Sequence, residues 1–410
     1  MKNRTVIVML LLTAAVVPCN AGGYISPWLS AWYLGMSGSG TAGFQSPGTI
    51  IINPASGAWL NHPAAQINGG LNWADAAFLR TGSFETVATR TAAFSSISAF
   101  AVWRKKPESR FTWGLGVSSP YSIAVQWPEN WDGAFLNQEL FINSLFLTPS
   151  ASLMIGDRLS LGLSVSAGVI NLSTSKALNI SGAGNVLPAE KLNGRRLGGR
   201  IQAGLVWQVS ASTRVGISYQ SSLLGEDIQG EASFNPPALF AEFYPDTDFR
   251  YTLPGPAELR AGLAFRVDPK WELYLDAHHT GWKALDTVSI EYETQTALLT
   301  NEKQDWNWKN TIAVRAGSVW DLGKKGKLFL GMSFDPTPVP QDRVTPQLPE
   351  GSRIAFSGGT SWQLQEHLSI EIAGGYSTTG ERLGIFAPRN FGGTYQMQDI
   401  SAQIGLNWQW

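Results

Sequence analysis

The segment from Ile400 to Trp410 constrains the fold most strongly, because large or apolar side chains alternate strictly with small or polar ones along it. A β-strand has a side-chain period of two, so this segment has one apolar face and one polar face. The apolar face carries Trp408 and Trp410. An edge strand of a water-soluble protein avoids such a surface because it invites aggregation. The segment therefore predicts a strand of a transmembrane β-barrel.

The amino terminus has the features of a secretory signal peptide. Lys2 and Arg4 precede an apolar run from 6 to 17, and small residues surround Ala21. The run is shorter than the roughly 20 residues that a membrane-spanning helix needs. We expect residues 1–21 to be removed, together with Cys19, the only cysteine. A chain that begins at Gly22 then has neither a disulfide nor a reactive thiol.

Charge and composition narrow the class further. Lys and Arg number 30 against 31 Asp and Glu, so no basic surface for nucleic acid is expected. Beyond the signal no apolar run is long enough for a transmembrane helix. This is compatible with a soluble all-β protein and equally with a membrane barrel, in which only half of each strand has to be apolar. The 43 glycines and 17 tryptophans favour the barrel.

The rest of the chain predicts an all-β fold, a 14-stranded antiparallel transmembrane β-barrel. An even number of strands is usual for a single-chain bacterial barrel, as are short turns at one end and long loops at the other. Tryptophans gather beside the predicted short turns, where an aromatic girdle is expected. The expected strands are 63–79, 92–104, 111–121, 142–155, 159–171, 197–209, 213–222, 258–267, 271–281, 308–321, 327–335, 353–363, 368–377 and 398–410.

Residues 22–61 show no strand alternation. They are rich in Gly, Ser, Ala and Pro, and they are too apolar for a free tail. A barrel of this size has a wide lumen, since interior width grows with strand number. We therefore expect 22–61 to form a plug, or hatch, inside a barrel made by 62–410.

Three motifs stand out in the first part of the chain. The first is Asn53-Pro54-Ala55 after the Gly-rich segment 35–43. The second runs from Gly114 to Ile123 with 131–133 beyond it, and the third combines 147–150 with 159–162. Together they resemble the FadL family of outer-membrane transporters of long-chain fatty acids and hydrocarbons, and the first resembles that family's hatch motif. The resemblance implies a monomeric, non-enzymatic channel in the bacterial outer membrane.

The resemblance also implies a transport route. A hydrophobic ligand binds among apolar extracellular loops, passes to a lumen pocket, and leaves sideways through the wall beside a kink in the third strand. Pro120, with Gly114 and Gly116, is the counterpart of that kink, because proline removes a ladder donor. The alternative is that Pro120 only ends the strand at the outer rim.

Apolar residues in the long loops are the candidate ligand-binding surface, because exposed apolar patches usually bind something. The alternative is that these rings pack against neighbouring loops. Tyr24, Ile25 and Trp28 resemble the family segment that reaches the inner pocket. The loop candidates are Leu136, Phe141, Phe234, Leu239, Phe240 and Phe243.

Charged residues on the lumen faces of the predicted strands suggest internal ion pairs that brace barrel and hatch. An arginine fork also suits a carboxylate, and Arg315 or Arg353 is the expected partner for a fatty acid headgroup. An aromatic hydrocarbon would need no such group. The sequence leaves open a fatty acid transporter, an aromatic hydrocarbon transporter of the same family, an outer-membrane lipid hydrolase and a water-filled porin, although a hatch argues against the porin.

An enzyme is not expected. His278 shares a strand face with Asp276, but no nucleophile motif accompanies them, so a lumen hydrogen bond is the favoured interpretation. Neither a metal site nor a cofactor-binding motif has the necessary spacing. Expected partners are a hydrophobic ligand, outer-membrane lipid and lipopolysaccharide, and the barrel assembly machinery, for which Trp410 takes the place of the usual terminal Phe.

Overall fold

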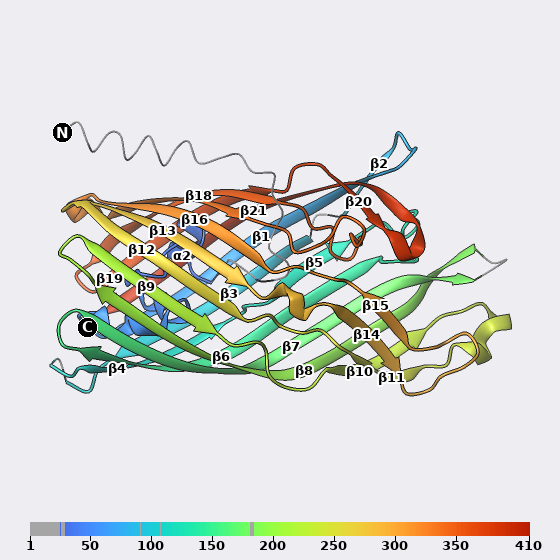
Figure 1. Cartoon of the computed structure of the whole chain (residues 1–410), viewed down its shortest axis with the longest axis horizontal. Coiled ribbons are helices and arrows are strands. Elements are labelled where there is room, and N and C mark those ends of the chain that lie inside the picture. Colours follow the sequence, from blue (N-terminus) through green and yellow to red (C-terminus); the bar gives the residue numbers. More distant parts are fainter. Residues whose placement is uncertain (1–24, 26–28, 91, 107, 181–183) are drawn as a thin grey trace.

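Fourteen strands close into an antiparallel barrel in the computed structural model, which describes residues 25, 29–90, 92–106, 108–180 and 184–410. The prediction of a 14-stranded barrel is confirmed (Figure 1). Each wall strand pairs with its neighbour along the chain, and the last pairs with the first. The wall strands are β1 (Ala64–Arg80), β3 (Ala92–Trp103), β4 (Phe111–Ser118), β6 (Glu139–Ile155), β7 (Leu159–Ile180), β8 (Gly184–Gln208), β9 (Thr213–Gln220), β12 (Glu258–Asp268), β13 (Trp271–Thr280), β16 (Thr311–Asp321), β17 (Lys327–Asp335), β18 (Arg353–Gln365), β19 (Leu368–Thr378) and β21 (Phe391–Gln409).

The closing pair β1–β21 shows how alternation sets the wall. Its register runs from Ala64↔Gln409 to Arg80↔Gly393 without a shift. Ile400, Ile404 and Trp408 are exposed on the outside, whereas Gln403 between them is buried toward the lumen. Apolar residues outside and polar residues inside are the reverse of a soluble barrel and suit a wall that faces lipid.

The two ends of the barrel differ. At one end the strands are joined by short turns such as 156–158, and exposed tryptophans including Trp103, Trp113, Trp207, Trp362 and Trp408 lie close to them. At the other end, on the right in Figure 1, the loops form a cap of further strands and 3-10 turns. These are β2 (Thr86–Ala88), β5 (Ser122–Gln126), β10 (Ile228–Phe234), η3 (Ala238–Phe243), β11 (Thr247–Tyr251), η4 (Trp282–Ala284), β14 (Thr287–Tyr292), β15 (Glu302–Asp305), β20 (Arg382–Phe386) and η6 (Ala387–Arg389), with η5 (Gly323–Lys325) at the turn end.

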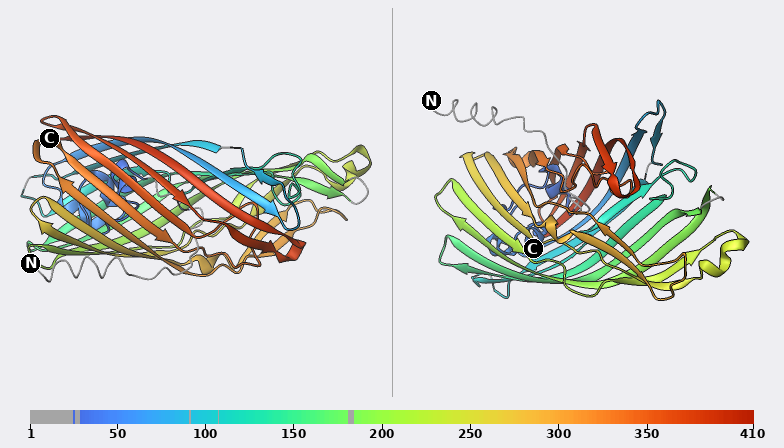
Figure 2. Two further views of the ribbon diagram at one scale, coloured as in Figure 1. Left: turned by 90° about the horizontal axis from the view of Figure 1, so that it is seen from above. Right: turned by 45° about the vertical axis from the view of Figure 1, so that its right-hand side comes forward.

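The cap has an apolar core of its own. Trp127 and Trp131 stack with ring centroids 4.5 Å apart, and Phe78, Phe391 and Tyr395 surround them. Figure 2 shows the cap strands extending beyond the barrel from two further directions. The loops predicted at this end therefore continue as strands: β7 and β8 run well past the expected limits of 171 and 197, because their polar extensions still pair with each other.

The N-terminal segment lies inside the barrel, as predicted for a plug. It contains α2 (Ala31–Gly35), η1 (Pro47–Ile51) and η2 (Pro54–Trp59). α2 contacts β17, β18 and β19, whereas η2 contacts β6, β7 and β8 on the other side. Among the residues that the structure describes, no helix is long and apolar enough to cross a membrane. The predicted signal peptide, 1–21, lies outside the described residues.

Candidate functional site

A cavity occupies the lumen between the hatch and the cap. Its apolar side chains come from the hatch, the wall and the cap, and include Ile25, Leu29, Leu34, Phe146 and Trp282. Its charged side chains come from wall strands alone: Arg200, Glu258, Arg260, His278, Arg315, Asp335 and Arg353. Many Ser, Thr and Gln side chains complete the lining, so the cavity combines apolar surface with a largely polar wall. Convergent polar groups beside apolar surface can orient a small molecule that has both kinds of surface.

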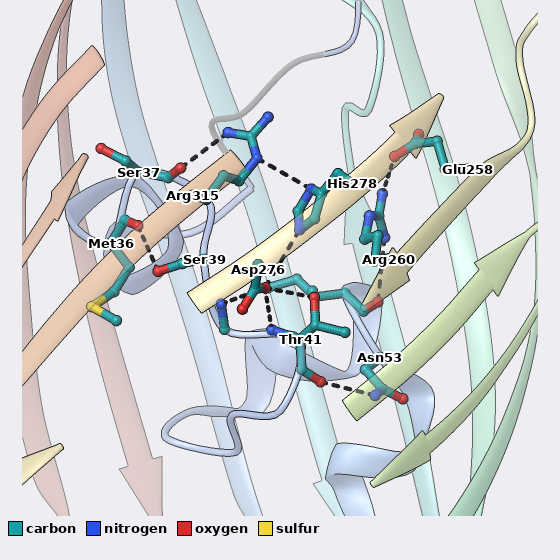
Figure 3. Close-up of polar contacts among 12 residues, drawn as sticks. Met36, Ser37, Ser39, Thr41, Asn53, Glu258, Arg260, Asp276, His278 and Arg315 are labelled. Carbon is teal, nitrogen blue, oxygen red and sulfur yellow. Dashed lines mark hydrogen bonds and ion pairs between the residues drawn. The ribbon is translucent and has the colours of Figure 1, made fainter. Parts of the chain in front are cut away.

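Asp276 on β13 anchors the hatch to the wall (Figure 3). Its Oδ2 accepts hydrogen bonds from the backbone N–H of Gly40 at 2.9 Å, the N–H of Thr41 at 2.8 Å and the Thr41 hydroxyl at 2.7 Å. The His278 ring lies 3.4 Å away. A buried carboxylate is stable where several donors converge on it. The hydrogen bond predicted between His278 and Asp276 is therefore one part of a larger contact.

Arg315 on β16 joins the cavity to the hatch. It donates to the Ser37 carbonyl oxygen at 3.0 Å and to His278 Nδ1 at 3.2 Å, and pairs with Asp335 at 2.5 Å. These contacts are drawn in part in Figure 3. Each group of donors on this guanidinium therefore has a partner within the protein. Arg315 was one of two predicted carboxylate partners, and its contacts brace the hatch.

Arg353 at the start of β18 is bound more loosely. Its nearest acid is Asp399 on β21, with Nη2 and Oδ2 3.5 Å apart, and its Nε has no hydrogen-bond partner within the described part of the chain. The side chain lines the cavity and is mostly buried. A guanidinium with unused donors at a cavity wall can accept a further anionic partner.

The Asn53-Pro54-Ala55 motif holds the hatch against the opposite wall. Asn53 caps η2: its Oδ1 accepts from the Ala55 N–H, while its Nδ2 donates to the carbonyl oxygens of Thr41 at 2.9 Å and Leu205 at 3.0 Å. A Cβ at Gly204 would collide with the Asn53 side chain, and one at Gly162 with the backbone at Pro54 and Ala55. The motif can therefore approach the wall closely because Gly162 and Gly204 have no side chains there.

Pro120 lies at a break in the third wall strand. The expected strand 111–121 ends at Ser118, and β5 resumes at Ser122, while β6 pairs with both pieces. β4 pairs with β3 only along residues 99–103, so the ladder between them stops at Val117. Gly114 and Gly116 lie below the break, in the part of β4 paired on both sides, against Ile50 and Ile51 of the hatch. The structure therefore places Pro120 at the break between β4 and β5, whereas Gly114 and Gly116 lie in the regularly paired part of β4.

The N-terminal segment reaches this break. Ile25 forms an isolated antiparallel bridge with Tyr121, and both Ile25 and Pro120 line the lumen cavity. Ser144 on β6 holds the other side of the break, donating to the Tyr121 carbonyl and accepting from its N–H. Tyr24 and Trp28, the other residues predicted to enter the pocket, lie outside the described residues.

The predicted loop residues divide among four places. Phe234 and Phe240 contact Leu178 and Ile180 in a small cluster of their own. Leu239, 82% exposed, and Phe243 project from η3 toward solvent. Leu136 lines a smaller cavity inside the cap, and Phe141 is partly exposed on β6. One continuous groove made by all six residues is not what the structure shows.

A charged cluster in the cap was missed by the sequence analysis. Lys176 Nζ lies 2.6 Å from Glu302 Oε1 and 3.3 Å from Glu190 Oε2, and the Tyr292 hydroxyl donates to Glu190. Burial opposes the ionisation of Glu302, but the charge and hydrogen bond of Lys176 outweigh it and keep the Glu302 pKa below its usual range. Lys176 and Glu190 come from the β7–β8 hairpin, whereas Tyr292 and Glu302 come from the β14–β15 hairpin, so no local spacing in the sequence could have indicated the cluster. Within the described residues no group of three or more His, Cys, Asp or Glu could hold a metal ion.

Comparison with known proteins points to one family. Residues 12–384 match the family profile described as "Outer membrane protein transport protein (OMPP1/FadL/TodX)". A long-chain fatty acid transport protein of Salmonella typhi is 21% identical over 292 residues, which are 65% of this chain and 66% of that protein, just under two thirds.

Solved structures share the fold over nearly the whole chain. A Pseudomonas aeruginosa FadL homologue has a TM-score of 0.82 at 17% identity, covering 94% of this chain and 99% of the other. The Ralstonia pickettii toluene transporter TbuX has a TM-score of 0.71 at 16% identity, covering 92% and 97%. Identities this low compare architecture alone, and the predicted resemblance to the FadL family is confirmed by the profile match.

Proposed function

Because the chain belongs to the outer membrane protein transport protein family (OMPP1/FadL/TodX), we propose that it carries long-chain fatty acids, or hydrophobic acids like them, across the bacterial outer membrane. The observation that carries the proposal is Arg353. Its guanidinium lies 3.5 Å from its nearest acid, whereas Arg260 and Arg315 in the same cavity form ion pairs of 2.6 Å and 2.5 Å, and the lining also offers apolar side chains. An acid with a long alkyl chain would satisfy both kinds of surface.

The route would begin at the cap. Leu239 and Phe243 on η3 expose apolar surface where a hydrophobic solute first arrives, and Phe234 and Phe240 lie behind them. The ligand would then bind in the lumen cavity, where its carboxylate pairs with Arg353. The break at Pro120 is the proposed exit, because the β3–β4 ladder stops there beside the cavity.

The hatch would control the last step. Ile25 occupies the break by pairing with Tyr121, and the same N-terminal segment continues into α2 beneath the cavity. Exit at the break requires Ile25 to leave Tyr121. Asn53 would keep the rest of the hatch seated on the wall during that movement.

An aromatic hydrocarbon is the second candidate substrate. The likeness to a toluene transporter supports it, and an uncharged ring would use the cavity without Arg353. The role of Arg353 therefore separates the two substrates. A carboxylate that loses a charge-assisted hydrogen bond loses roughly 1.5–3 kcal/mol of binding free energy, which is about tenfold or more in affinity.

Uptake of labelled oleate and labelled toluene tests the proposal, in cells with the protein, without it, and with Arg353→Gln. We expect oleate uptake to depend on the protein and to fall about tenfold in Arg353→Gln at low oleate concentration, with toluene uptake unchanged. Arg80→Gln is the matched control, because Arg80 pairs with Asp132 on the exposed cap, away from the cavity. Equal oleate uptake with and without the protein would reject the proposal, and toluene uptake alone would support the second candidate.

A further inference from the structure

The connection between β17 and β18, residues 336–352, folds into the cap over the lumen cavity. It leaves the wall at Asp335 and returns at Arg353, and both of these residues line the cavity. Val339, Val344 and Leu348 are buried in the apolar core of the cap. An irregular loop is usually found on the surface, because its backbone groups are hard to satisfy in the interior. This loop instead packs into the core of the cap, while the residues at its two ends line the cavity.

The loop differs from four paired connections of the cap in how it is held. β7–β8, β10–β11, β14–β15 and β20–β21 are joined by ladders of backbone hydrogen bonds. Residues 336–352 contain only the isolated bridges Arg343↔Phe386 and Thr345↔Leu348. Five of these residues are prolines, which have no N–H to lose when the loop moves: Pro336, Pro338, Pro340, Pro346 and Pro349. Few ladder bonds oppose its movement, so its buried side chains and a small number of polar contacts set its opening free energy.

Two side chains from neighbouring elements hold the loop in place. Arg382 on β20 donates to the Glu350 carbonyl oxygen at 2.5 Å and to the Val339 carbonyl oxygen at 2.6 Å, thereby joining the two limbs of the loop. Trp127, just after β5, donates from its indole N–H to the Pro346 carbonyl oxygen at 2.9 Å. The backbone N–H groups of Ile385 and Ala387 also donate to the loop, to the carbonyl oxygens of Gln341 and Asp342.

We propose that residues 336–352 are a lid over the lumen cavity, closed in this structure, and that Arg382 is the residue that keeps it closed. Opening the lid would withdraw Val339, Val344 and Leu348 from the cap core and connect the cavity with the outside. The lid deepens the proposed function, on which it rests for its purpose, because it supplies the controlled step between capture at the cap and binding at Arg353.

A cysteine in the cavity reports on the lid without any ligand. Ala313 lines the cavity and is almost fully buried, and its side chain makes no polar contact that Ala313→Cys would remove. Purified protein carrying Ala313→Cys is exposed to an anionic methanethiosulfonate reagent, and labelling is followed by intact mass. The same protein without Ala313→Cys shows any labelling at the single native cysteine, Cys19, if that residue is retained.

We expect Arg382→Ala to raise the labelling rate of Ala313→Cys about tenfold, the factor that corresponds to roughly one charge-assisted hydrogen bond. Trp127→Phe keeps an aromatic ring in the core but removes the bond to Pro346 and part of the packing against Trp131. Because both bonds from Arg382 remain, it should raise the rate less. Arg80→Ala removes a cap arginine that does not contact the loop and should leave the rate unchanged.

Equal labelling of Arg382→Ala and its parent would overturn the lid. If Arg382→Ala does not give a folded barrel, as judged by heat-dependent migration in gels, Trp127→Phe decides: a faster rate supports the lid and an unchanged rate rejects it. Because labelling needs no fatty acid, a failure of oleate uptake would count against the proposed function and leave the lid result standing.

Discussion

At the scale of single residues, the hatch is held where its backbone is least regular. Ser37, Gly38 and Gly40 have φ values of 48°, 77° and 125°, a left-handed region that is unfavourable for a residue such as serine. Arg315 binds the Ser37 carbonyl oxygen, and Asp276 collects the N–H groups of Gly40 and Thr41. The wall therefore supplies the partners that this turn cannot find within itself.

Asn53→Ala tests the hatch motif at this scale. The change removes a helix cap and two side-chain bonds to carbonyl oxygens, and such losses cost about 1–3 kcal/mol. We expect slower oleate uptake, by several-fold, with unchanged assembly of the barrel in outer membranes. Asn193→Ala is the control, since Asn193 makes an exposed contact with Ser173 in the cap. Unchanged uptake in Asn53→Ala would remove the motif from the mechanism.

At the scale of elements, the third wall strand is the least regular part of the wall. β4 and β5 share one partner, β6, but the chain between them leaves the ladder at Ser119 and Pro120. Sequence reasoning left two interpretations of Pro120 open, a gap in the wall or the end of a strand. The structure combines them: β4 ends just before Pro120, and pairing resumes at Ser122.

A disulfide between Ile25→Cys and Tyr121→Cys tests the proposed exit, because these two residues form a bridge at the break. We expect the oxidised double variant to bind oleate but to release it too slowly for measurable uptake, since the N-terminal segment cannot leave. Reduction of the same protein should restore uptake, so each preparation serves as its own control. Equal uptake before and after reduction would show that the ligand leaves by another path.

At the scale of the whole molecule, the barrel closes through its first and last strands. β21 pairs with β1 from Gln409 to Gly393, and the Trp410 N–H donates to the Pro63 carbonyl oxygen beyond the end of that ladder. Trp408 and Trp410 are exposed at the turn end, beside the other girdle tryptophans. Their position suits both the lipid interface and the proposed recognition by the assembly machinery.

Replacing these two residues separates the two roles. We expect Trp408→Ser with Trp410→Ser to lower the assembled fraction in outer membranes several-fold, and Trp410→Phe to leave it close to that of the parent. Trp362→Ser removes an exposed tryptophan of the same girdle from another strand. If Trp362→Ser lowered the assembled fraction as much as the double variant, assembly would depend on the aromatic girdle and not on the end of the last strand.

The sequence by itself determined the class of fold, the number of wall strands and which residues face lipid, because alternation with a period of two is a local property of each strand. Motifs near Asn53 and Pro120 were local as well, and they indicated the family. Only the tertiary structure decided that Asp276 holds Gly40 and Thr41, that Lys176 lies between Glu190 and Glu302, and that residues 336–352 fold inward into the core of the cap. Those contacts join segments far apart along the chain, and they exist only once the barrel has closed and its loops have packed together.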